Sequence, residues 1–127
     1  MKRRTFFQRL FGGIGAVAAA AALGDETRSV LIQESPIAGY QFYEGDWIWS
    51  SLAVGAPLKL ERESKNEHDS NAVAVYFHEE QLGYVPRVEN TAIAQMLDRG
   101  EHLEARITKL KLVENPWDRV RFDILLT

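Results

Sequence analysis

Alternation between apolar and polar residues predicts three β-strands in this chain. Residues 58–62 (LKLER) and 120–126 (VRFDILL) place an apolar residue at every second position, which is typical of a strand with one buried face. Residues 72–77 (AVAVYF) are apolar throughout, as in a strand that is buried on both faces. These three segments form the centre of the predicted sheet.

Shorter runs add strands at other places in the chain. Residues 28–34 (RSVLIQE) precede a Ser-Pro pair, and residues 82–85 (LGYV) precede Pro86. In the aromatic run 40–43 (YQFY), an extended backbone would turn the first and third residues to one face, so we expect an exposed strand or a sheet edge there. Residues 47–57 fit either a helical turn or an irregular cover.

Two further patterns complete the predicted fold. Residues 88–99 follow helical spacing and end before Gly100, which suits the position after a helix. Residues 103–112 alternate, but the apolar positions change parity after Ile107, so we expect a β-bulge near residues 108 and 109. About six short strands with one inserted helix favour a mostly β (α+β) domain, a small OB-like barrel.

The first 24 residues are typical of an export signal. A basic start that contains Arg3 and Arg4 precedes an uncharged stretch rich in alanine and glycine. Paired arginines followed by Thr-Phe-Phe fit a twin-arginine (Tat) signal, and the uncharged stretch is shorter than the roughly 18 residues of a spanning helix. We therefore expect residues 1–24 to be a cleavable signal peptide and residues 25–127 to be an exported, periplasmic or extracellular domain with no membrane span.

Removal of this segment leaves an acidic domain. The first 24 residues hold four of the 15 basic residues and none of the 18 acidic ones, so residues 25–127 carry a net charge of −7. Such a domain lacks the broad positive field of ordinary nucleic-acid-binding proteins, and any nucleic acid must bind a local site. The chain has no cysteine, which excludes disulfides, thiolate nucleophiles and Cys-based zinc sites.

A dense polar segment, residues 66–71 (NEHDSN), lies between two of the predicted strands. Asn and Asp side chains bond nearby backbone amides, so this segment suits a tight connection. The carboxylate of Asp69 also accepts hydrogen bonds from a free hydroxyl and repels a phosphate, which suits a chain end or a sugar. We expect a turn that also forms one wall of a pocket.

Three segments closely resemble the HIRAN domain in order and spacing. They are GYQFYEG, LKLERESKNEHDSNAVAVYF, and LGYVPRVEN followed by a helix that ends at glycine. The resemblance covers nearly all of residues 29–127 and implies an OB-like barrel. It also implies DNA binding, because characterised eukaryotic members capture the 3′ end of single-stranded DNA.

The resemblance implies site residues as well. The family's Arg-Tyr-Tyr run, which stacks on the terminal bases, corresponds to residues 41–43 (QFY), so the aromatic platform is kept and the cation is lost. Its Asn-Pro-Tyr-Asp corresponds to residues 66–69 (NEHD), and Arg87 occupies the place of a basic phosphate contact. The candidate nucleic-acid-binding residues are Gln41, Phe42, Tyr43, Asn66, His68, Asp69, Tyr84 and Arg87.

Three functions stay open at this stage. The first is recognition of a single-stranded DNA 3′ end by an aromatic platform and an Asn/Asp pocket, without catalysis by this chain. The second is an exported module that binds a protein or a small ligand and no DNA, which the predicted location favours. The third is an accessory of a metal-dependent hydrolase. His68 and His78 lie beside carboxylates, but no zinc-ligand spacing is present, so we expect no cofactor.

Overall fold

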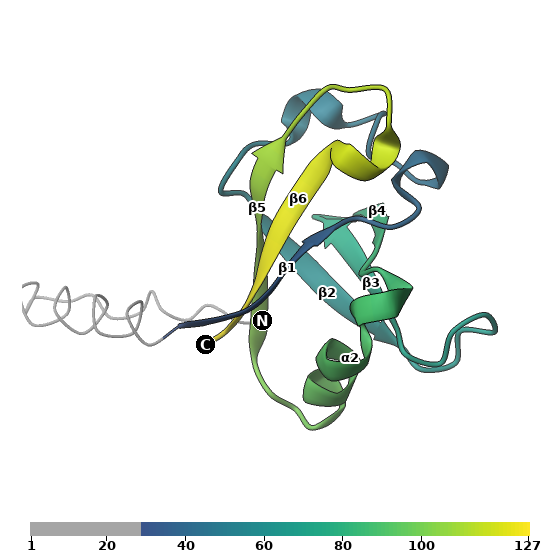
Figure 1. Ribbon diagram of the computed structural model, residues 1–127, viewed down its shortest axis with the longest axis vertical. Helices are drawn as coiled ribbons and strands as arrows, with labels where there is room; N and C mark the ends of the chain where they lie inside the picture. Colours follow the sequence, from purple (N-terminus) through teal and green to yellow (C-terminus); the bar gives the residue numbers. More distant parts are fainter. Residues whose placement is uncertain (1–28) are drawn as a thin grey trace, which may run out of the picture. The chain divides into compact units, whose positions relative to one another are not determined.

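Six antiparallel strands form one sheet in the computed structural model, which describes residues 29–127; the predicted signal segment lies outside these residues. The strand order is β1-β6-β5-β2-β3-β4 (Figure 1), as expected for a mostly β fold with one inserted helix. The strands are β1 (Val30–Pro36), β2 (Pro57–Glu63), β3 (Ala72–Phe77), β4 (Glu80–Tyr84), β5 (Leu103–Leu110) and β6 (Val120–Leu126).

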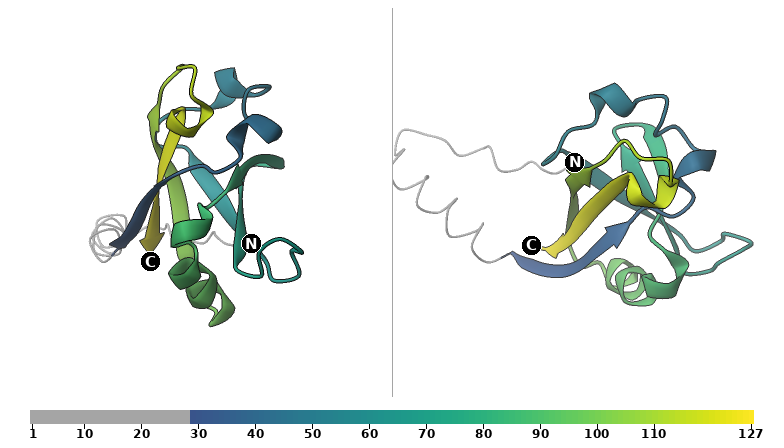
Figure 2. Two further views of the ribbon diagram at one scale, coloured as in Figure 1. Left: turned by 45° about the vertical axis from the view of Figure 1, so that its right-hand side comes forward. Right: turned by 45° about the horizontal axis from the view of Figure 1, so that its top comes forward.

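The sheet closes on itself just after β1. Ala38 and Tyr84 exchange two backbone hydrogen bonds, with N–O distances of 2.8 and 3.0 Å, and so join the chain leaving β1 to β4 at the other edge. Gly83 permits this approach, because its φ is 151° and a Cβ atom there would lie 2.3 Å from the Ala38 carbonyl oxygen. The result is the predicted OB-like barrel, with β1 and β6 side by side in its wall (Figure 2).

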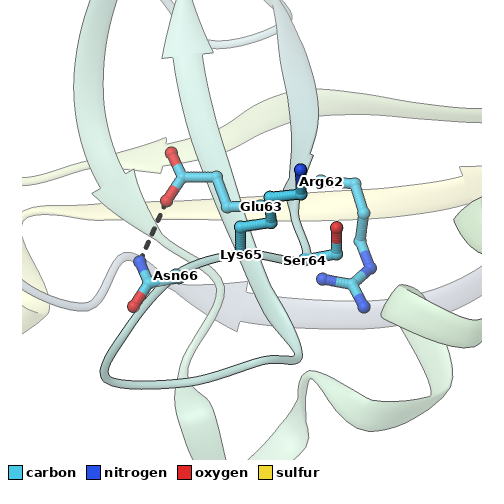
Figure 3. A pocket seen from close by; sticks show the side chains of 5 residues that line it. All are labelled: Arg62, Glu63, Ser64, Lys65 and Asn66. Carbon is cyan, nitrogen blue, oxygen red and sulfur yellow. Dashed lines mark hydrogen bonds between the residues drawn. The ribbon is translucent and has the colours of Figure 1, made fainter.

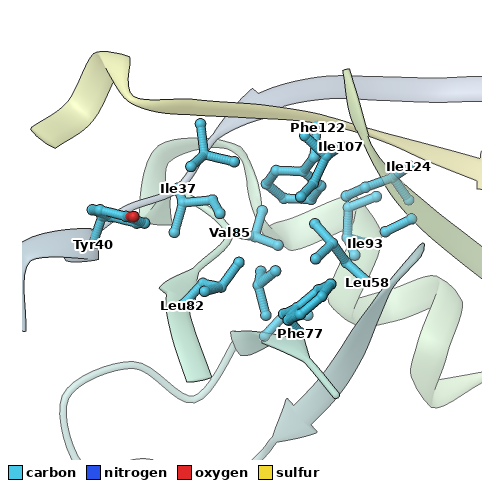
Figure 4. Packing of buried hydrophobic residues seen from close by; sticks show 14 of the residues in the cluster. Ile37, Tyr40, Leu58, Phe77, Leu82, Val85, Ile93, Ile107, Phe122 and Ile124 are labelled. Carbon is cyan, nitrogen blue, oxygen red and sulfur yellow. The ribbon is translucent and has the colours of Figure 1, made fainter. Parts of the chain in front are cut away.

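Apolar side chains from β2 to β6 fill the barrel (Figure 4). The alternation predicted for β6 holds, because Val120, Phe122 and Ile124 are buried in the core. Burial of each such side chain contributes about 1.5–3 kcal/mol. The helix α2 (Thr91–Asp98) adds the buried Ile93 to the same cluster.

The predicted bulge in β5 is present. The register between β5 and β6 shifts between Ile107 and Lys109, so Thr108 is the extra residue. Ile107 stays in the core, while Arg106 before the bulge and Lys109 after it are both exposed.

The helical region is shorter than predicted. A 3-10 turn, η4 (Arg87–Glu89), precedes α2, and Asn90 lies between the two. The Asn90 side chain forms a hydrogen bond with Asp69. Gly100 has φ of 82°, as predicted for the residue after the helix. Between residues 29 and 127, we find no helix with the length and apolar character needed to cross a membrane.

The aromatic run at 40–43 is not a strand, so that prediction was wrong. Gly39 has φ of 72°, and this left-handed conformation turns the chain into a 3-10 helix, η2 (Tyr40–Phe42). Tyr40 is buried and packs so closely on Gly45 that a Cβ atom there would lie 2.0 Å from the ring, whereas Phe42 is exposed. The following cover segment contains a second 3-10 turn, η3 (Trp49–Ser51).

Candidate functional site

The connection between β2 and β3 is built by its own polar side chains. The Asn66 Oδ1 atom accepts hydrogen bonds from the backbone N–H groups of His68 and Asp69, at 2.8 and 3.1 Å. Asp69 Oδ1 in turn accepts one from the backbone N–H of Asn71 at 2.9 Å. The predicted turn is therefore present, and its two Asx side chains hold it in shape.

Asp69 also ties this connection to the segment before α2. Its Oδ2 atom accepts a hydrogen bond of 2.8 Å from Nδ2 of Asn90, which is only 2% exposed. The Arg87 guanidinium donates to the His68 carbonyl oxygen at 2.5 Å and lies 4.0 Å from the Asp69 carboxylate. Burial by itself raises the pKa of Asp69, but the hydrogen bonds from Asn71 and Asn90, together with Arg87, bring the pKa below its usual 3.8.

Two tyrosines and a phenylalanine form the aromatic part of the site. Phe42 is 77% exposed, so its ring is open to a ligand. Tyr43 packs edge-on against Tyr84, with ring centroids 5.8 Å apart and planes at 67°. The Tyr84 hydroxyl donates to Glu63 Oε1 at 2.7 Å. Burial and this hydrogen bond raise the pKa of Tyr84 to about 12, so the phenol stays protonated at neutral pH.

Glu63 joins the aromatic and polar parts. Its Oε1 atom accepts both the Tyr84 hydroxyl and the Asn66 Nδ2 group, the second at 3.0 Å. A continuous set of contacts therefore runs from Tyr43 through Tyr84, Glu63 and Asn66 to the 66–71 connection. We call this set the site network.

Five of the eight candidate residues belong to the site network: Tyr43, Asn66, His68, Asp69 and Tyr84. Arg87 contacts the network through the His68 carbonyl oxygen. Gln41 and Phe42 are exposed beside it on η2. Sequence analysis missed Glu63 and Asn90. The signal for both was weak: a charged residue at the end of a strand, and an Asn inside a helical pattern.

An open pocket of about 430 Å³ lies next to Asn66 (Figure 3). It is lined by Arg62, Glu63, Ser64, Lys65 and Asn66. Arg62 is held in this wall by Asp98, 3.0 Å away, and by the Ala72 carbonyl oxygen. The described residues contain no group of three or more His, Asp or Glu side chains placed to hold a metal ion.

Several side chains at this site offer groups that can bind a ligand. An exposed ring face at Phe42 can stack on a planar group, and Arg87, whose side chain is 72% exposed, offers N–H donors. Each carboxylate oxygen of Asp69 can accept more than one hydrogen bond, so this residue keeps acceptor capacity beyond its internal partners. Its side chain is 21% exposed.

Comparisons with known proteins find related domains. The model of the HIRAN domain matches residues 30–127. A protein of known structure from Lactobacillus plantarum is 25% identical, with a TM-score of 0.65 over 78% of this chain and 97% of that chain. The HIRAN domain of human HLTF is 18% identical, with a TM-score of 0.58 over 77% of this chain and 78% of that chain. A search of curated proteins found no match.

Proposed function

This chain belongs to the HIRAN domain family, and from that premise we propose that its site network and the adjacent Phe42 bind the 3′ end of single-stranded DNA. HIRAN domains generally bind nucleic acids. The observation that carries the finer proposal is the site network, because it fixes Asp69 and Arg87 in one arrangement with an aromatic surface.

Stacking supplies the affinity in this proposal. Bases stack on aromatic side chains for roughly 1–3 kcal/mol each, and this contribution needs no positive charge on the protein. Phe42 is open, and Tyr43 is held edge-on by Tyr84 and so offers a fixed ring. This source of affinity suits a domain with an excess of acidic residues.

The polar part supplies the preference for an end. Asp69 accepts a hydrogen bond from a terminal 3′-hydroxyl but repels a 3′-phosphate, because its lowered pKa keeps it ionised at neutral pH. Arg87 beside it carries the opposite charge and suits the phosphate of the preceding linkage. Together they select a hydroxyl-terminated strand.

The test is fluorescence anisotropy of 5′-labelled single-stranded oligonucleotides that end in a 3′-hydroxyl or a 3′-phosphate. We expect tighter binding of the hydroxyl form. Phe42→Ala should weaken it roughly five- to hundredfold, the loss of one stacked base. The matched control is Leu31→Ala, which truncates another exposed apolar side chain, 56% exposed, near the start of β1.

Asp69→Asn should remove the discrimination between the two ends while leaving some affinity, because the amide cannot repel a phosphate. Equal binding of the two ends by the unaltered protein, or equal losses from Phe42→Ala and Leu31→Ala, would contradict the proposal.

A further inference from the structure

Three cationic side chains on the outer face of β5 and just beyond it make no ion pair within residues 29–127. Arg106, Lys109 and Lys111 are all exposed. Of the other Lys and Arg side chains in that range, only Lys65 shares this property, and the rest lie within 4.0 Å of a carboxylate. We call these three residues the cationic row.

The bulge at Thr108 creates the row. Side chains alternate between the two faces of a strand, so without an extra residue Lys109 would point to the opposite face from Arg106. With Thr108 inserted, Arg106 lies opposite Asp123 and Lys109 lies opposite Arg121. Asp123 and Arg121 are both on the outer face of β6, so Arg106 and Lys109 share the outer face of β5. The bulge thus gathers positive charge on one face of a domain whose overall charge is negative.

Sheet stability does not account for this arrangement. Like charges directly opposite each other on neighbouring strands are destabilising, and Lys109 faces Arg121. Arg121 has its own partner in Glu34 at 3.6 Å, and Asp123 forms no ion pair with Arg106 within 4.0 Å. Lys109 thus stands opposite a like charge at a cost to the sheet, and this placement favours an external anion as its partner.

The end of the row at Lys111 lies close to η2, the turn that carries the exposed Phe42. The Lys111 backbone N–H donates to the Arg119 carbonyl oxygen at 2.8 Å. The Arg119 guanidinium bonds both carboxylate oxygens of Asp46, at 2.8 and 2.9 Å, and lies 6.0 Å from the centre of the Tyr40 ring. Tyr40 begins the η2 turn that presents Phe42, so this end of the row and the proposed stacking surface share one rim.

We propose that the cationic row binds the phosphodiester backbone of the nucleic acid whose 3′ end occupies the site network, so that the strand continues across the rim onto β5. This inference rests on the proposed function and adds the path of the strand. Contacts to phosphates position a nucleic acid without reading its sequence. The row therefore predicts affinity that grows with strand length and falls with salt.

The test compares Lys109→Gln/Lys111→Gln with Lys59→Gln/Arg99→Gln, a control of equal net charge whose changes lie on β2 and after α2. Affinities are measured for 3′-hydroxyl oligothymidylates of 4 and 12 nucleotides over a range of salt concentrations. Each phosphate contact on single strands contributes about 0.7 to the slope of log affinity against log salt. For the 12-mer we expect the slope of the Lys109/Lys111 variant to be shallower by about 1.4, with no change for the control.

Separate outcomes address this inference and the proposed function. If the 4-mer and 12-mer bind equally tightly, or if both double variants change the slope equally, the row is not a backbone contact, while a retained preference for the 3′-hydroxyl leaves the end site standing. If poly-glutamate competes as well as the 12-mer of equal charge, the row binds acidic protein and the inference is overturned. Absence of binding to either oligonucleotide removes both proposals.

Discussion

Asp69 connects two parts of the domain through one carboxylate. It accepts from Asn71 in its own loop and from Asn90 before α2, and Arg87 lies beside it. Burial opposes ionisation, but these contacts prevail and lower the pKa of Asp69 below 3.8. A carboxyl group whose pKa is lower in the folded than in the unfolded state contributes stability above its unfolded pKa, and this contribution is lost as pH falls through the folded pKa.

We therefore expect Asp69→Asn to reduce the acid sensitivity of the fold. Between about pH 5 and pH 3 the melting temperature of the unaltered protein should fall more steeply than that of the variant, because only the former must protonate this carboxyl group. Thermal unfolding followed by circular dichroism measures the difference. Glu67→Gln, in the same loop and exposed, should retain the steep dependence. Parallel curves for Asp69→Asn and the unaltered protein would show that Asp69 has no such role.

At the residue scale, the sequence predicts contacts that are local and misses those that are not. Asn66 and Asp69 bond backbone groups within three residues, so turn chemistry was enough to anticipate them. The long-range hydrogen bonds of the site, from Tyr84 to Glu63 and from Asn90 to Asp69, each join residues that lie 21 apart along the chain. Pairing over that distance depends on how β4 and α2 pack, which no spacing rule contains.

At the scale of elements, closure of the barrel depends on the contact between β4 and the chain that leaves β1. Gly83 allows it, since any side chain there would collide with the Ala38 carbonyl oxygen. The same contact lies next to η2 and Tyr84, so the contact between the Tyr43 and Tyr84 rings depends on closure.

Gly83→Ala should destabilise the domain by about 3 kcal/mol or more, because the added methyl group separates two backbones that exchange hydrogen bonds. Gly55→Ala is the control: its φ is 91°, but nothing lies within 4 Å of the new Cβ atom, so the cost should be about 1 kcal/mol of backbone strain. Urea unfolding of both variants gives the comparison. Similar costs at the two positions would mean that closure tolerates the extra atom.

Strands with a clear apolar pattern, either alternating or continuous, were predicted well, and an element set by a single backbone angle was not. The strand at 72–77 matches β3 and that at 120–126 matches β6, and the bulge in β5 followed from a change in parity. The strand predicted at 40–43 is absent because the left-handed conformation of Gly39 starts a 3-10 turn. In such a turn, buried and exposed aromatic residues can follow each other in the same order as in a strand. Local pattern could not decide between the two.

At the scale of the whole molecule, the net charge changes sign at the end of the predicted signal segment. The basic Arg3 and Arg4 lie in residues 1–24, and the remainder is acidic. We propose export through the twin-arginine route, which acts on folded proteins. The proposed ligand is then nucleic acid outside the cytoplasm.

Export is tested by Arg3→Lys/Arg4→Lys in a bacterial host. Since the twin-arginine signal is read through the arginine pair itself, the conservative change should retain the protein, uncleaved, in the cytoplasmic fraction. Arg9→Lys conserves charge in the same way and should leave export intact. Immunoblots of the separated fractions report the outcome, and normal export of the double variant would exclude this route.

The pairing of β1 with β6 affects how the domain folds during its synthesis. Val30 lies opposite Leu126, so the wall of the barrel cannot be finished until nearly the last residue of the domain has emerged from the ribosome. Contacts between such distant parts of a chain slow folding. The barrel therefore stays incomplete during translation until β6 has left the ribosome and can pair with β1.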